Sequence, residues 1–154
     1  MSCAWEYTVF MSSISDSPVP VSIAELDLPM IGSSVQCGFP SPAEDFQVSR
    51  LDLTSLLIRH PQATFFFRAA GTSMIEAGID HGDLLAVDRA ITPANRQIVV
   101  AIVDGEFTVK YLQIRAGRLR LKAANSTFPD IVPRDGQTIE VWGVVTACIK
   151  LFKV

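Results

Sequence analysis

After residue 60 the chain consists mostly of short apolar or alternating hydrophobic and polar segments separated by turn residues, which is typical of β-strands. The pattern predicts six strands, over residues 64–70, 83–88, 98–103, 106–114, 119–123 and 138–150. Asp104-Gly105, between the third and fourth of them, is a strong signal for a tight hairpin. One short helix is predicted over residues 52–58, because Asp52 can cap its start and Pro61 follows its end. The predicted fold class is therefore mainly β, a compact domain with short helices.

The first 37 residues follow neither pattern. They contain four acidic residues and no lysine or arginine, and prolines and serines interrupt any periodicity. Their formal charge is −4 and that of the whole chain is −3, so the remaining 117 residues carry +1. We therefore expect a flexible N-terminal arm, residues 1–37, followed by a β-rich domain, residues 38–154. Met11 is an alternative start, which would leave residues 1–10 outside the protein.

Composition narrows the classes of function. The chain has 154 residues, of which 49% are hydrophobic and 19% charged, enough apolar material for one folded domain. A net charge of −3 argues against a dedicated nucleic-acid-binding protein. The most basic stretch contains Arg115, Arg118, Arg120 and Lys122, which alternate with leucines, so we interpret it as the solvated side of a hairpin.

The cysteines and the apolar runs indicate a cytoplasmic protein. Cys3, Cys37 and Cys148 are odd in number and far apart, which favours neither a disulfide framework nor a metal site. No apolar run approaches the roughly 18 residues of a membrane span. The N-terminal 13 residues lack the basic and apolar regions of a secretory signal.

Residues 71–78, between two predicted strands, contain the first candidate for chemistry. Ser73 followed by Glu76 forms a capping-box pattern, and Gly78 is a plausible helix stop. On this interpretation Ser73 only caps a helical turn. The same geometry suits a nucleophile, because free backbone N–H groups at a helix start can stabilise an oxyanion.

A serine nucleophile needs a base. His60 resembles a surface cap residue and His81 lies in a turn, so neither is decisive. Lys110 lies inside a predicted strand and shares a face with Thr108 and Leu112. An exposed lysine there would guard the strand against aggregation. A buried lysine would instead have a lowered pKa and could accept the serine proton as a neutral amine.

Three segments carry a resemblance to a known family. Residues 35–43 (VQCGFPSPA), 71–75 (GTSMI) and 104–110 (DGEFTVK) resemble the UmuD branch of the LexA-like self-cleaving serine peptidases, in the same order and at similar spacing. LexA-type repressors carry an N-terminal helix-turn-helix, for which residues 1–37 are too short. Signal peptidases have a similar Ser-Lys site but need a membrane anchor. Arg96-Gln97 departs from the family, which commonly has Gly-Asp there.

The resemblance implies a fold and a site. The fold would be the compact β domain shared by LexA and signal peptidases. Ser73 would be the nucleophile and Lys110 the general base, with the backbone N–H groups of Ser73 and Thr72 holding the oxyanion. The bond between Cys37 and Gly38 would be cut, releasing the arm. No metal or other cofactor is implied.

The resemblance also implies partners. A RecA filament on single-stranded DNA would stimulate the cut in a bacterial cytoplasm. The processed chain would be a homodimer that serves a UmuC-like translesion DNA polymerase in SOS mutagenesis. Neither sequence-specific DNA binding nor a membrane is expected.

Three alternative hypotheses about the function remain open. The Cys37 thiol could be the nucleophile, although no basic residue lies near it in the sequence. The domain could be a non-catalytic interaction module in which the serine and the lysine are incidental. It could also be a LexA-type repressor that has lost its DNA-binding half.

Overall fold

The body of the protein is a six-stranded antiparallel sheet. The computed structural model describes residues 27–32, 37–38 and 48–154. The strand order across the sheet is β3-β4-β8-β5-β6-β7. These strands are β3 (Thr64–Arg68), β4 (Leu84–Asp88), β5 (Ile98–Val103), β6 (Glu106–Arg115), β7 (Arg118–Lys122) and β8 (Ile139–Ile149). The prediction of a mainly β fold is confirmed, and each of the six predicted strands is present with ends shifted by no more than two residues.

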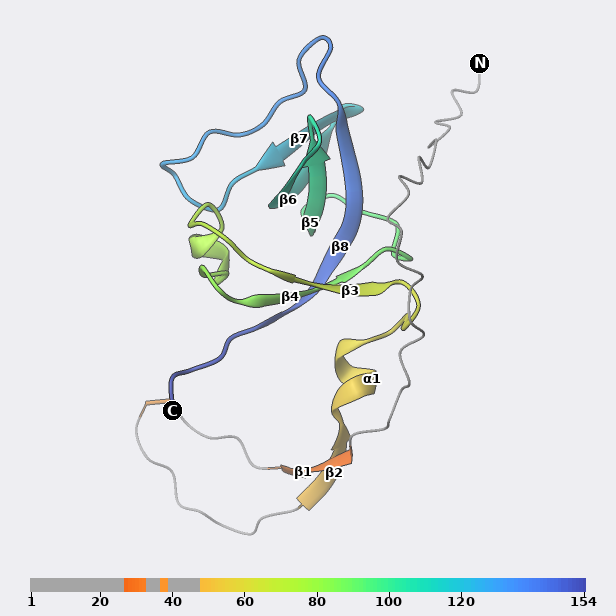
Figure 1. The fold of residues 1–154 in the computed structure, drawn as a ribbon, viewed down its shortest axis with the longest axis vertical. Coiled ribbons are helices and arrows are strands. Elements are labelled where there is room, and N and C mark those ends of the chain that lie inside the picture. The colour runs from red at the N-terminus through yellow and green to blue at the C-terminus, as the bar shows by residue number, and fades with distance from the viewer. Residues whose placement is uncertain (1–26, 33–36, 39–47) are drawn as a thin grey trace.

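Strand β8 joins the two halves of the sheet. It pairs with β4 through its second half and with β5 through its first half, and Figure 1 shows it running the length of the body. Register shifts in both pairings bend the sheet. Gly143 lies at this bend, where an added Cβ would come within 2.8 Å of Val87 Cγ1. The close approach of the strands explains a glycine in the middle of β8.

The core consists of two apolar clusters. The first contains Leu85, Val87, Val100 and Met74, and the second contains Val99, Ala101, Leu112, Leu121 and Val144. Neighbouring residues Val99 and Val100 belong to different clusters, so β5 is buried on both faces.

None of the helices in the described part of the chain is long and apolar enough to cross a membrane.

A second, two-stranded sheet precedes the body. β1 (Asp27–Ile31) pairs antiparallel with β2 (Val48–Asp52), and Arg50 forms an ion pair with Asp27. The predicted helix follows as α1 (Leu53–Leu57), and the Asp52 carboxylate caps it by accepting from the Thr54 N–H at 3.0 Å. The sequence pattern missed β1 and β2, because both lie in segments rich in proline and polar residues. Of the predicted arm, residues 1–26 and 33–36 lie outside the described residues.

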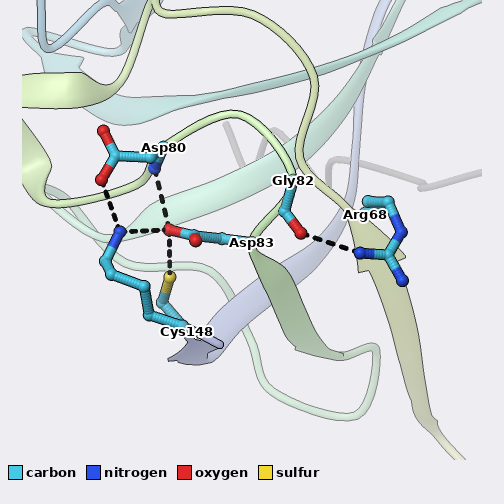
Figure 2. Close-up of polar contacts among 6 residues, drawn as sticks. Arg68, Asp80, Gly82, Asp83 and Cys148 are labelled. Atoms are coloured by element: carbon cyan, nitrogen blue, oxygen red, sulfur yellow. Dashed lines mark hydrogen bonds and ion pairs between the residues drawn. The ribbon is translucent and has the colours of Figure 1, made fainter. Parts of the chain in front are cut away.

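A charged cluster ties the end of β8 to the loop before β4. Lys150 Nζ lies 2.6 Å from Asp80 Oδ2 and 2.6 Å from Asp83 Oδ2. Figure 2 shows Cys148 converging on the same carboxylate, with Sγ 3.4 Å from Asp83 Oδ2. Hydrogen bonding from Lys150 lowers the pKa of Asp83, and these carboxylates raise the pKa of Lys150. Burial, then the Asp83 hydrogen bond, raises the pKa of Cys148, so the thiol stays protonated and donates.

This cluster holds the loop that follows the candidate site. Arg68 Nη1 donates to the Gly82 carbonyl at 2.9 Å, as Figure 2 shows, and the Gly82 N–H donates to the Ala69 carbonyl at 2.8 Å. The Asp80 N–H donates to Asp83 Oδ2 at 2.8 Å. The segment between β3 and β4 is therefore fixed at its C-terminal end by both backbone and side-chain bonds.

The first prediction concerns acid stability. Asp83 has a lowered pKa in the folded chain, so it stabilises the fold above its ordinary pKa near 4, and this contribution is lost as the pH falls through the lowered value. Lys150→Met removes the main cause of the shift. We expect the midpoint of acid unfolding, followed by circular dichroism, to move to higher pH. Lys153→Met, at an exposed position nearby in the sequence, is the control and should leave the midpoint unchanged; equal shifts in both variants would contradict the prediction.

The second prediction concerns the departure at Arg96. This residue has a φ of 72°, a left-handed conformation that costs a residue with a side chain about 1–2 kcal/mol. Glycine avoids this strain but has more freedom to lose on folding, about 0.5–1 kcal/mol. Arg96→Gly should therefore raise the free energy of unfolding by about 0.5–1 kcal/mol in urea titrations. Arg96→Ala keeps the Cβ and should bring no gain, so equal stability of the two variants would refute the explanation.

Candidate active site

A buried lysine lies against Ser73 at the centre of the candidate site. Lys110, on β6, is only 7% exposed, and its Nζ lies 2.7 Å from Ser73 Oγ. Nζ also donates to the Val109 carbonyl at 3.0 Å and to Thr108 Oγ1 at 3.2 Å. The alternative interpretation, in which Lys110 is exposed and protects the strand from aggregation, is therefore wrong. The structure also confirms that Thr108 shares a face with Lys110.

The surroundings of Lys110 favour its neutral form. Burial lowers the pKa of Lys110. Among the ion pairs of the described residues, none involves this ammonium, so no carboxylate offsets the loss of water. A neutral amine has two N–H donors and one lone pair. A neutral amine that donates to the Val109 carbonyl and to Thr108 Oγ1 has its lone pair left to accept the hydrogen of the Ser73 hydroxyl.

The capping box predicted around Ser73 is wrong. The helical turn η1 (Ile75–Ala77) starts one residue later, with Met74 at its N-cap and no side-chain cap. The Ser73 hydroxyl is bonded to Lys110 instead, and Glu76 Oε1 accepts from the Ser126 N–H at 3.3 Å. Gly78 ends the turn with a φ of 78°, as predicted.

Residues far away in the sequence hold the Ser73 segment. The Ala124 N–H donates to the Ser73 carbonyl at 2.9 Å, and the Glu76 N–H donates to the Ala124 carbonyl at 2.9 Å. Asn125 Nδ2 donates to the Thr72 carbonyl at 2.9 Å. No local pattern marks Ala124 or Asn125, because only the fold brings the end of β7 to this segment.

The same contacts orient backbone N–H groups near Ser73. In a trans peptide, the C=O and the following N–H point in opposite directions. The Thr72 carbonyl is directed to Asn125, so the Ser73 N–H is directed away from it. Within the described residues, the N–H groups of Thr72 and Ser73 donate to no other backbone group. Both donors therefore remain for a bound group.

A cavity of about 300 Å³ opens beside Ser73. Its walls are mainly apolar and include Phe67, Met74, Phe107 and Val109. Phe67 and Phe107 are 5.4 Å apart between ring centroids, and Trp142 lies edge-on to Phe67 at 5.0 Å. Phe107 is 56% exposed, so this aromatic cluster forms an accessible rim. The cavity suits an apolar stretch of polypeptide with its backbone near Ser73.

The histidines lie elsewhere. His60 Nδ1 is 2.6 Å from Asp88 Oδ2, and this carboxylate is almost fully buried, so His60 is more than the surface cap that the sequence suggested. His81 Nδ1 accepts from the Gly71 N–H at 3.2 Å. Neither ring is hydrogen-bonded to Ser73, whose side-chain partner in the described structure is Lys110.

Cys37 and Gly38 are not brought to this site. Both residues are exposed, and no hydrogen bond joins either of them to another described residue. Neither of them lines the cavity beside Ser73. The structure thus assembles the predicted serine and lysine and leaves the predicted cut site apart from them.

Comparison with known proteins identifies the family. The model of the family described as Peptidase S24-like matches residues 29–146. The chain is 46% identical over 121 residues to protein SamA of Salmonella typhimurium, covering 79% of this chain and 84% of SamA. It is 42% identical over 120 residues to protein MucA of Escherichia coli, covering 77% and 82%.

A LexA repressor is also among its relatives. The LexA repressor of Dechloromonas aromatica is 39% identical over 129 residues, covering 83% of this chain and 63% of the repressor. The resemblance inferred from three short segments is thus confirmed over most of the chain. The protein belongs to the Peptidase S24-like family, a family of peptidases that includes relatives of LexA.

Proposed function

We propose that this protein is a self-cleaving serine peptidase that cuts its own chain between Cys37 and Gly38. Ser73 is the nucleophile and Lys110 the general base. The observation that carries the proposal is the 2.7 Å contact between the Ser73 hydroxyl and a buried lysine of lowered pKa, at the edge of an apolar cavity. A merely structural role does not explain a buried amine that has no carboxylate partner among the described residues.

The first half of the reaction forms an acyl-enzyme. Neutral Lys110 takes the proton of Ser73 Oγ, which attacks the carbonyl carbon of Cys37. The N–H groups of Ser73 and Thr72 stabilise the oxyanion. Lys110, now an ammonium, gives its proton to the Gly38 nitrogen as the C–N bond breaks. Gly38 leaves as a new amino terminus, and Cys37 remains as an ester on Ser73 Oγ.

The second half releases the arm. Lys110 is neutral again and takes a proton from a water molecule that attacks the ester carbonyl. Collapse of the tetrahedral intermediate returns a proton to Ser73 Oγ and frees the carboxyl group of Cys37. The small side chains at the cut let the backbone come close to Ser73, and the apolar walls of the cavity receive the flanking residues.

The cut changes the body that remains. It separates residues 1–37, with a charge of −4, from residues 38–154, with a charge of +1 before the new termini are counted. The arm includes β1, so β2 loses its partner strand and Arg50 loses Asp27. An unpaired strand edge is a ready surface for another chain. We propose that the processed chain acts as a homodimer with a UmuC-like translesion DNA polymerase in SOS mutagenesis.

Self-cleavage must be regulated, because the peptidase and the bond that it cuts belong to the same chain. Cys37 is exposed and does not line the cavity beside Ser73, so the described arrangement does not present the bond for cutting. An activator that binds the cleavable arrangement more tightly shifts the population toward it. We propose that a RecA filament on single-stranded DNA fills this role in the bacterial cytoplasm.

The third prediction tests the cut and the nucleophile. Purified protein incubated with RecA, nucleotide and single-stranded DNA should give two fragments whose masses place the junction at Cys37/Gly38. Ser73→Ala removes the nucleophile and should slow cleavage at least about 1,000-fold. Intact-mass spectrometry over a time course measures both.

Ser55→Ala, a serine of α1, is the matched control and should cut at the wild-type rate. A junction elsewhere would contradict the proposed site. Cleavage by Ser73→Ala would favour another nucleophile, including the Cys37 thiol. A chain that never cuts under these conditions would favour a non-catalytic interaction module.

The fourth prediction tests the base. The rate of self-cleavage without an activator should rise about tenfold per pH unit while Lys110 is mostly protonated, and should level off once the pH passes its lowered pKa. The plateau should be reached below the ordinary lysine pKa of about 10.4. Lys110→Arg keeps the charge but cannot become neutral, so it should not cut at any pH up to 10. A rate that does not rise with pH anywhere between about pH 4 and 10 would contradict a lysine base.

A further inference from the structure

A row of basic side chains covers one face of the β6–β7 hairpin. The register pairs Tyr111 with Lys122, Gln113 with Arg120, and Arg115 with Arg118. Residues directly opposite each other in an antiparallel pair lie on the same face. The alternate residues Leu112 and Leu121 are buried, so the charged residues occupy the outer face. We call these six side chains, together with Arg96, the basic face.

The cations of the basic face are largely uncompensated. Arg120 lies 3.3 Å from Asp130, and the ion pairs within the described residues include none of the other four cations. Arg115 and Arg118 face each other directly, an arrangement that is unfavourable on its own. Since the whole chain carries −3, four cations on one hairpin face, with Arg96 beside them, form a local excess of positive charge. An anion bound between them would relieve their repulsion.

A cavity of about 360 Å³ lies at one end of the basic face. Arg96, Tyr111, Gln113 and Lys122 line it, together with Glu76. Its volume is in the range of small-ligand sites. Tyr111 is half-buried and packs partly against the first core cluster, so its ring is held in place at the cavity wall. The backbone N–H of Arg96 donates to the Leu112 carbonyl at 2.7 Å, which holds the backbone of Arg96 next to β6.

We propose that the basic face binds the phosphodiester backbone of single-stranded nucleic acid, with one base held against Tyr111 in the cavity. Same-face residues two apart on a strand are about 6.8 Å apart, so the cations form a track along which successive phosphates can lie. A basic track combined with an aromatic ring is the usual design of sequence-independent single-strand binding. Binding of single-stranded nucleic acid at the basic face does not require the proposed cleavage.

The cavity favours a nucleotide over an acidic peptide. Glu76 would repel a carboxylate side chain that entered it, but its free acceptor capacity suits the N–H groups of a base. A duplex fits less well, because its bases are stacked inside and cannot reach Tyr111. The basic face thus offers donors for phosphates and a separate aromatic site for a base.

The test is fluorescence anisotropy of a labelled 20-nucleotide oligothymidylate titrated with the full chain. At 50 mM salt we expect a Kd on the order of 10 µM, within the usual range for non-specific binding. Four free cations predict a slope of log K against log salt of about −2 to −3, since each neutralised phosphate of a single strand contributes about −0.7. The absence of binding at 200 µM protein would overturn the proposal.

Two double variants that change the net charge by the same amount test whether the nucleic acid binds at the basic face. Arg115→Glu/Arg118→Glu should weaken binding at least tenfold and reduce the slope by about 1.4, which corresponds to two phosphates. This variant keeps two like charges in opposition, so thermal unfolding should change little. Arg59→Glu/Lys153→Glu alters the net charge equally at exposed positions off the hairpin and should weaken binding less than threefold. Equal weakening in both variants would show a bulk charge effect and overturn the proposal.

Competition identifies the class of ligand. Unlabelled oligothymidylate should displace the probe more effectively than a duplex of the same length. A duplex that competes equally well would refute the single-strand assignment. Polyglutamate that competes better than the oligonucleotide would also refute it, and would assign the basic face to an acidic protein partner.

Discussion

The burial of one amine, with no carboxylate partner in the described part of the chain, is the constraint on which the site depends. A charged Lys110 has three acceptors within reach but no counter-ion among the described residues, so removal from water acts against the ammonium. The surrounding sheet must be stable enough to maintain this burial. The β5–β6 pairing that carries Lys110 is flanked by β8, whose paired strands on both sides supply the two core clusters. A stable sheet can thus keep in place a lysine that destabilises it, which is common where a fold serves chemistry.

Much of the fold is predictable because its strands obey a simple rule. A strand with one buried face alternates apolar and polar residues, as β7 does, and a strand buried on both faces is a continuous apolar run, as β5 is. The six strands of the body carry one or the other signal. β1 and β2 do not, since they form a small sheet with mostly exposed side chains and need no apolar face. Pro29 in β1 also argued against a strand, yet proline is tolerated at the edge of a two-stranded sheet.

The sequence predicted the two reacting side chains of the site, but not the residues that hold them in position. Lys110 and Ser73 were identified by their resemblance to a family, whereas neither local pattern alone separated function from structure. The capping-box prediction failed because the serine hydroxyl has a stronger partner 37 positions away, and a sequence window cannot include such a partner. Asn125 and Ala124 were missed for the same reason, since their roles arise from where β7 ends in the folded chain.

The Ser73–Lys110 site and the cavity of the basic face lie on either side of one backbone segment, which contains Ala124. Ala124 lines the cavity of the basic face, and its N–H and C=O bond to Ser73 and Glu76 at 2.9 Å each. Glu76 itself lines that cavity and belongs to the turn that follows Ser73. A ligand that displaced Ala124 would therefore strain the bonds that orient the Ser73 carbonyl, and with it the position of the hydroxyl against Lys110. Coupling between the sites requires no long pathway, because a single pair of backbone hydrogen bonds separates them.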